Sequence, residues 1–223
     1  MIIARRYRGP AASANGGYVS GRLAAYLDGP VEVTLRLPPP LERRLALERH
    51  DDRVLLLDGE AVVAEAVAAE VDVEPPLRLT PAEAADAAAR HARMAGESFN
   101  ECFSCGVRSD GDGLGIHPGP VPGTQVQATP WAPREVSPEI VWAAIDCPGA
   151  YAVGGPGRGD VLLGRMAAEL ERLPAVGERC VVVAWPVGEE GRKLFAGTAL
   201  LAEDGEILAR ARQTWIAPRS EPK

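Results

Sequence analysis

A weak internal repeat between the two halves of the 223-residue chain constrains its fold more than any other feature. The first half contains RVLLLDGEAVVAEAVAAEV (residues 53–71), and the second contains KLFAGTALLAEDGEILARARQTWI (193–216). In each, Asp-Gly joins two apolar segments, and this pair tolerates the positive φ angles of a tight hairpin turn. We therefore predict two antiparallel hairpins, with turns at residues 58–59 and 204–205.

The repeat extends upstream of both hairpins. Residues 35–49 and 170–185 are proline-containing segments that each lead into a further predicted strand. Residues 14–29 and 136–154 each have the pattern of a helix. The order helix, strand, strand, strand therefore occurs twice, which favours duplication of one unit over coincidence.

A separate helix is predicted between the halves, in LTPAEAADAAARHARMAGE. Thr80 is a suitable N-cap, Pro81 suits the first helical position, Glu83 completes a capping box, and Gly96 is a plausible stop. We treat this helix as a connector. The expected organisation is an N-terminal domain, the connecting helix and a C-terminal domain, at residues 1–78, 79–97 and 98–223.

The charge balance excludes one class of partner. With 24 Lys and Arg against 31 Asp and Glu, the formal net charge is −7. The chain lacks the basic excess that displaces counterions from phosphates, so we expect no nucleic-acid partner. No apolar run has the length of a signal peptide or of a membrane span. We therefore expect no membrane association and a cytoplasmic location.

Two of the four cysteines, Cys102 and Cys105, form a Cys-x-x-Cys pair. A zinc site requires four ligands, and only His117 follows at a suitable spacing, so we predict no metal and no cofactor. The glycines after the pair disfavour the helix of a redox site, and a turn leading into a strand at residues 113–117 is the favoured interpretation. Cysteines this sparse are expected to be free thiols.

Two segments resemble one known family. CFSCGVRSDGDGLGI (102–116) resembles the Cys-x-x-Cys-Gly segment that precedes the first strands of many hotdog-fold acyl-CoA thioesterases. GPAASANGGYVSGRLAAYL (9–27) resembles their helix-opening segment, commonly His-Gly-Gly. Across nearly the whole chain, the resemblance implies an α+β fold of two tandem hotdog domains. Each would be a long central helix wrapped by a curved antiparallel sheet.

The sequence departs from the family pattern at both helix starts. Asn15 stands where the family has histidine, and residues 137–139 are Ser-Pro-Glu where it has glycines. Hotdog proteins commonly assemble, so the resemblance also implies a homodimer or a larger homo-oligomer.

Thioester cleavage requires hydrogen-bond donors for the oxygen that becomes negative in the transition state. The first N–H groups of a helix are unpaired, and its dipole favours negative charge. Asn15 can cap a helix here and donate through its amide, while Gly16 and Gly17 leave room for a thioester. We interpret these residues as oxyanion donors. The alternative is a capped helix start with no further role.

Cleavage also requires a nucleophile or a base, and Asp146 is the candidate. It is the only charged residue of IVWAAIDCPGAYAV (140–153). A carboxylate in apolar surroundings needs a partner or a task, and the resembling thioesterases carry an Asp or Glu near this point as nucleophile or base. The alternative is a cap at the helix end, before Pro148. Cys147 has no histidine partner, and we interpret it as packing.

An ungapped alignment of the two predicted central helices places Asn15 over Ser137 and Ala24 over Asp146. In each half, the helix start and the acid position are nine residues apart, about 13 Å along a helix, so one thioester cannot contact both. Antiparallel helices would bring the start of one to the acid position of the other. Only the site that combines Asn15, Gly16 and Gly17 with Asp146 then has both the donors and the acid. This predicts one active site per chain and an inert second site.

The substrate is expected to be acyl-CoA or a related thioester. Arg158, in a glycine-rich segment, is a candidate for the CoA phosphates, although this segment also reads as a surface loop. Tyr18, Trp142 and Tyr151 are candidates for the apolar acyl pocket, or equally for the core.

Three functions fit these features, and an acyl-CoA thioesterase is favoured. The first alternative is a non-catalytic double-hotdog protein that binds acyl-CoA or another small ligand. The second is a hydratase or dehydratase, which would carry a histidine on the central helix. The histidines at positions 50, 91 and 117 lie outside both predicted central helices, and we interpret His91 as structural.

Overall fold

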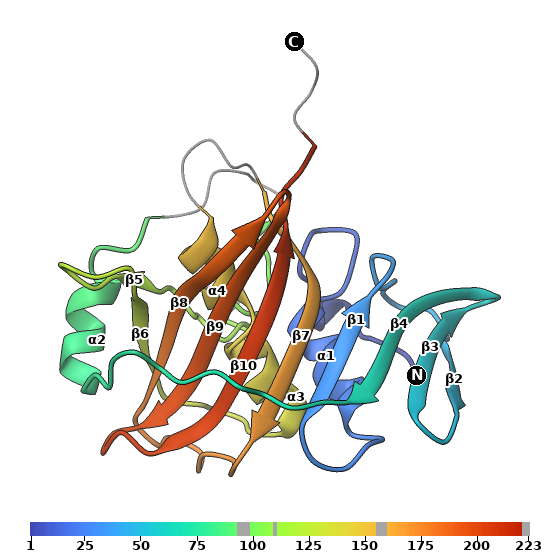
Figure 1. The fold of residues 1–223 in the computed structure, drawn as a ribbon, viewed down its shortest axis with the longest axis horizontal. Helices are drawn as coiled ribbons and strands as arrows, with labels where there is room; N and C mark the ends of the chain where they lie inside the picture. Colours follow the sequence, from blue (N-terminus) through green and yellow to red (C-terminus); the bar gives the residue numbers. More distant parts are fainter. Residues whose placement is uncertain (93–98, 109–110, 155–159, 220–223) are drawn as a thin grey trace.

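The computed structural model describes residues 1–92, 99–108, 111–154 and 160–219. Ten antiparallel strands form one continuous sheet (Figure 1). The strands of the first half are β1 (Val31–Leu35), β2 (Ala46–Arg49), β3 (Arg53–Asp58) and β4 (Ala61–Ala68). Those of the second half are β5 (Gly119–Pro120), β6 (Gln127–Trp131), β7 (Leu162–Leu170), β8 (Cys180–Glu190), β9 (Lys193–Ala202) and β10 (Ile207–Ile216).

The two halves repeat the same strand order. The first half runs β2-β3-β4-β1 across the sheet, and the second runs β8-β9-β10-β7. The first strand after each helix, β1 or β7, lies innermost, and these two strands pair antiparallel, with Val31 opposite Ala168. The predicted repeat is therefore visible in the topology, and the pairing of β1 with β7 joins the two half-sheets into one.

The hairpin predictions are confirmed to within a residue. Gly59 (φ 62°) follows the end of β3, and Gly205 (φ 86°) lies in the connection between β9 and β10. Strands β1 and β7 were not predicted. The β7 segment, LLGRMAAEL, is rich in residues that favour helix, but β1 and β10 pair with it on both sides and tertiary context overrides that preference.

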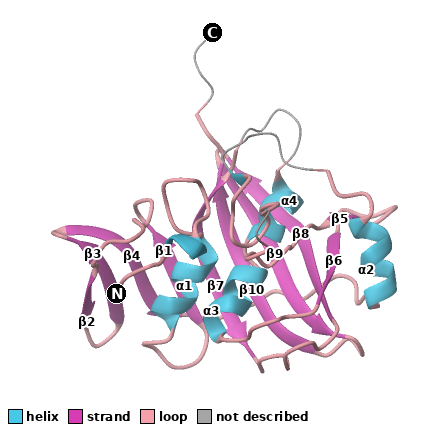
Figure 2. Ribbon diagram, turned by 180° about the vertical axis from the view of Figure 1, so that it is seen from behind, coloured by secondary structure: helices cyan, strands magenta, loops and turns pink. Residues whose placement is uncertain are grey.

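Three helices lie on one face of the sheet, where α1 (Gly16–Ala24) and α3 (Pro138–Ala144) pack side by side and α4 (Cys147–Val153) follows (Figure 2). The single helix expected over residues 136–154 is therefore wrong. Pro148 has no N–H to continue the hydrogen bonding of α3, and it restricts the backbone of the residue before it. The helix is therefore interrupted at Ile145 and Asp146, and α4 begins at the next residue.

The connecting helix, α2 (Pro81–Ala88), has the predicted Thr80 and Glu83 capping box. It is shorter than expected, and the predicted stop at Gly96 lies outside the described residues. Ala84 and Ala87 pack with the β8 residues Val181 and Val183, while the alternate β8 residues pack in the core that includes α3. Since alternate residues of a strand face opposite sides, α2 covers the other face of the sheet. The domain limits stay a prediction.

Helices α1 and α3 approach closely because α1 carries glycines on the facing side. A Cβ on Gly17 would lie 2.5 Å from Asp146 Cβ, and one on Gly21 would lie 2.6 Å from Glu139 Cα. The later glycine therefore meets the earlier residue of the second half, so the helices run antiparallel as predicted. Among the described residues, no helix is long and apolar enough to cross a membrane.

Replacement of Gly21 tests this close approach. Ala normally stabilises a helix by about 1 kcal/mol relative to Gly. Here Gly21→Ala should instead lower the free energy of unfolding by about 2 kcal/mol, because its methyl group meets the α3 backbone. Urea denaturation measures the change. Gly188→Ala is the control, since a Cβ there meets only Phe195 Cδ2, at 4.0 Å. A Gly21→Ala protein as stable as the parent would contradict the helix spacing.

Candidate active site

The carboxylate of Asp146 lies where the two halves meet. Its Oδ2 accepts two hydrogen bonds from the start of α1, one from Asn15 Nδ2 and one from the Gly17 N–H, both at 2.9 Å. Asn15 and Asp146 are each only 2% exposed. The structure thus brings together the helix start and the acid that the sequence analysis paired across the halves.

Asn15 does two things at once. Its Oδ1 accepts a hydrogen bond from the Tyr18 N–H at 2.8 Å, which caps α1, while its Nδ2 donates to Asp146. An amide side chain carries both an acceptor and donors, so one residue fixes the helix start and holds the acid. Capping and contact with Asp146 are therefore combined, and the capping role alone does not account for Asn15.

The second oxygen of Asp146, Oδ1, is buried and has no hydrogen-bond partner among the described residues. Burial raises the pKa of the Asp146 carboxyl to about 7, while the hydrogen bond from the Gly17 N–H acts in the opposite direction. The Asp146 side chain forms no capping hydrogen bond with α4, and none of the ion pairs among the described residues includes it. The helix-cap alternative is thus not what the structure shows.

Gln213 of β10 holds the helix break that presents Asp146, and the sequence analysis missed it. Its Nε2 donates to the carbonyl oxygens of Ile145 at 2.7 Å and Asp146 at 3.1 Å. Its Oε1 accepts from Trp215 Nε1 at 2.8 Å. The available signal was a single Gln on the otherwise apolar inward-facing side of β10.

A cavity of about 650 Å³ adjoins this acid. Asn15, Gly16 and Asp146 line it on the polar side, and Leu35, Leu163 and Trp215 are among its apolar walls. We find no acceptor for the Gly16 N–H among the described residues. This N–H therefore remains available to a bound molecule, whereas the Gly17 N–H already bonds to Asp146.

The aromatic residues proposed for the acyl pocket lie elsewhere. Tyr18 stacks on Tyr7, with ring centroids 3.7 Å apart. Trp142 is buried against Gly21, and Tyr151 packs beside the cysteines. None of the three lines this cavity, whose described walls include a different aromatic, Trp215. Arg158 lies outside the described residues. The predicted substrate-binding roles therefore gain no support here and stay predictions.

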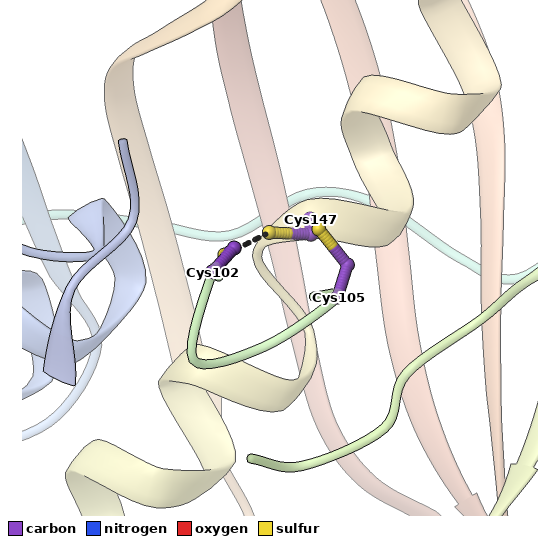
Figure 3. A group of neighbouring side chains, drawn as sticks. All are labelled: Cys102, Cys105 and Cys147. Carbon is purple, nitrogen blue, oxygen red and sulfur yellow. Dashed lines mark hydrogen bonds between the residues drawn. The ribbon is translucent and has the colours of Figure 1, made fainter. Parts of the chain in front are cut away.

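The cysteine pair gains a third member. Cys102, Cys105 and Cys147 are free, buried thiols whose sulfur atoms all lie within 4.8 Å of one another (Figure 3). The predicted turn is present, since the Gly106 N–H donates to the Cys102 carbonyl oxygen at 2.9 Å. The strand expected at residues 113–117 is wrong, because the next strand, β5, begins only at Gly119.

The start of α3 and the end of α1 lack the groups that meet at Asp146. Helix α3 begins at Pro138, which has no N–H, and its N-cap Ser137 forms no side-chain capping bond. Ala24 offers no carboxylate. Neither of the two groups that meet at Asp146 is present there, which is compatible with the predicted inert second site.

No protein-family model and no curated protein sequence matches the chain. Solved structures do. The chain is similar to acyl-CoA thioesterase II TesB2 from Mycobacterium marinum, with a TM-score of 0.61, 14% identity, and 99% of this chain and 92% of that chain covered. A conserved hot dog fold protein from Alicyclobacillus acidocaldarius gives a TM-score of 0.59, 12% identity, and coverage of 96% and 90%.

The tesB protein of Mycobacterium avium subs. paratuberculosis is also similar, with a TM-score of 0.56, 12% identity, and coverage of 92% and 88%. Together these likenesses establish the fold. The chain is a double-hotdog protein with an α+β architecture, as the sequence resemblance predicted.

Removal of Gln213 tests its positioning role. Gln213→Ala leaves the carbonyl oxygens of Ile145 and Asp146 without their donor, and each buried unpaired group costs about 1–3 kcal/mol. We expect the free energy of unfolding to fall by about 2–4 kcal/mol in chemical denaturation. Gln127→Ala, at a half-buried position at the start of β6, is the matched control. Equal effects of the two substitutions would show that Gln213 does not hold the helix break.

Proposed function

We propose that the protein is an acyl-CoA thioesterase that hydrolyses its substrate at the composite site between the two halves. Asn15, Gly16 and Gly17 come from the first half, and Asp146 comes from the second. One observation carries the proposal. Asp146 lines a largely apolar cavity with one oxygen held by two donors and the other oxygen without a partner.

In this proposal the three residues of the helix start have different roles, whereas the sequence analysis interpreted all three as oxyanion donors. Asn15 and Gly17 donate to Asp146 Oδ2, so they orient the carboxylate. Gly16 lines the cavity, and its N–H is the donor left for the thioester oxygen, which becomes negative as the carbonyl is attacked.

Asp146 Oδ1 has two possible roles that reach the same products. As a general base, it takes a proton from water, the oxygen of that water attacks the carbonyl carbon, and the C–S bond breaks. The proton then passes to the departing thiolate, which leaves as free CoA. As a nucleophile, Oδ1 attacks the carbonyl carbon, and the C–S bond breaks to release the CoA thiolate. Water then hydrolyses the resulting mixed anhydride to the free acid and the Asp146 carboxylate, and its proton passes to the thiolate.

The cavity and the structural likenesses support the substrate class. Its walls include Leu35, Leu163 and Trp215, which suit an acyl group better than a charged one. Gly16 sits between two of these walls, since a Cβ there would lie 2.9 Å from both leucine side chains. One structurally similar protein is named an acyl-CoA thioesterase, which agrees with a thioester substrate for this chain.

A specific observation favours the alternative of a ligand-binding protein without turnover. Two of the three expected oxyanion donors already bond to Asp146, which leaves one N–H for the substrate oxygen. Turnover measurements decide between the two functions.

The test is release of free CoA from short, medium, long and aromatic acyl-CoAs. Asp146→Asn keeps the shape of the side chain but removes the basic and nucleophilic oxygen, so turnover should fall at least about a hundredfold. Asp86→Asn, on the exposed side of α2, is the matched control and should leave turnover unchanged.

Measurable binding of acyl-CoA without hydrolysis of any ester would reject the enzyme and identify the protein as a ligand-binding double hotdog. Equal turnover in the Asp146→Asn variant and the parent would place the catalytic group elsewhere.

A further inference from the structure

Three cysteines from two distant parts of the chain converge beside the candidate active site. Cys102 and Cys105 lie in the loop before β5, and Cys147 is the first residue of α4 (Figure 3). The three side chains point toward one another, and the sulfur atoms of Cys102 and Cys147 are 3.6 Å apart. We propose that these three sulfurs bind one Zn²⁺ ion.

The spacing of the sulfur atoms suits a single ion. Zinc–thiolate bonds of about 2.3 Å in a tetrahedral site place the sulfurs about 3.8 Å apart. Here the Cys102 and Cys147 sulfurs are 3.6 Å apart, and all three sulfurs lie within 4.8 Å of one another. A disulfide would need a separation of about 2.05 Å, so the cluster is closer to the geometry of a metal site.

The loop that carries two of the sulfurs has a fixed conformation. A Cβ on Gly106 would lie 2.5 Å from both the backbone N and the O of Cys102, so only glycine fits after Cys105. The Gly106 N–H also donates to the Cys102 carbonyl oxygen at 2.9 Å, which closes the turn between the two cysteines.

An acidic group lies beside the cluster. Asp146 is next to the sulfurs, and no ion pair among the described residues includes it. Asn15 Nδ2 lies 3.8 Å from Cys102 Sγ and 3.9 Å from Cys147 Sγ, so the amide that holds Asp146 also faces two sulfurs. A divalent cation would compensate several thiolates and a carboxylate in one buried place.

The ion would keep an open position. No fourth His, Cys, Asp or Glu of the described residues joins the three-sulfur group, and all three cysteines line the cavity that contains Asp146. Three protein ligands with a fourth from solvent or substrate is the arrangement of catalytic rather than structural zinc sites. The binding of this ion does not depend on the proposed function.

Metal binding is measured directly on the 223-residue protein. After chelation, the reduced protein should take up one equivalent of Zn²⁺ and release protons as the thiols ionise. With Co²⁺ as the probe it should show thiolate-to-metal charge-transfer absorption. X-ray absorption on the zinc form should show three sulfurs at about 2.3 Å and one lighter atom.

Two variants and a matched control locate the ion. Cys105→Ser and Cys147→Ser should each weaken Zn²⁺ binding at least about a hundredfold, because each removes one of three ligands. Cys180→Ser, which alters the buried cysteine of β8 outside the cluster, should bind as the parent does. If Cys147→Ser fails to fold, Cys105→Ser and the parent protein carry the comparison.

Several results would overturn the proposal. These are the absence of cobalt–thiolate absorption, a four-sulfur coordination shell, or equal loss of binding in Cys180→Ser. A Cys102–Cys147 disulfide in protein purified without reductant, with no zinc uptake after its reduction, would overturn it too. Since no readout depends on hydrolysis, failure here is distinguishable from failure of the thioesterase proposal.

Discussion

The arrangement of the site depends on one carboxylate shared between the two halves of the chain. Asp146 reaches α1 only because Gly17 has no side chain, since a Cβ there would lie 2.5 Å from the acid's own Cβ. It is presented by a break between α3 and α4 that Pro148 causes and Gln213 holds through two carbonyl groups. The position of this one acid therefore depends on the close packing of α1, on the interruption between α3 and α4, and on the buried amide of Gln213.

The two halves share one backbone topology, but they carry different side chains at the helix start and at the acid position. Both halves have the same strand order, and their first strands pair at the centre of the sheet. The first half retains the glycine-rich helix start with Asn15, whereas the second begins its helix with Ser137 and Pro138. The acid stands only in the second half, where the first has Ala24. The backbone is therefore repeated in both halves, whereas the helix start with Asn15 occurs only in the first half and the acid only in the second.

The sequence predicted those features whose signals are local. Asp-Gly located both hairpins, and a single acid in an apolar segment identified Asp146. It did not predict β1 and β7, whose strand state follows from pairing between the halves. Cys147 and Gln213 were missed as members of the site for the same reason. Cys102, which faces Cys147, and the Ile145 carbonyl that Gln213 holds each lie more than 40 residues away. Contacts of that separation leave no periodic pattern in a single sequence.

The central claim is that Asn15 and Asp146 form one energetic unit across the two halves, and a double-mutant cycle measures this most directly. The free energy of unfolding is determined for the parent, Asn15→Ala, Asp146→Ala and the double variant. The lost cap of α1 contributes equally to both Asn15→Ala proteins and cancels in the cycle. We expect a coupling of at least about 1 kcal/mol, whereas effects that add to within about 0.3 kcal/mol would contradict the account.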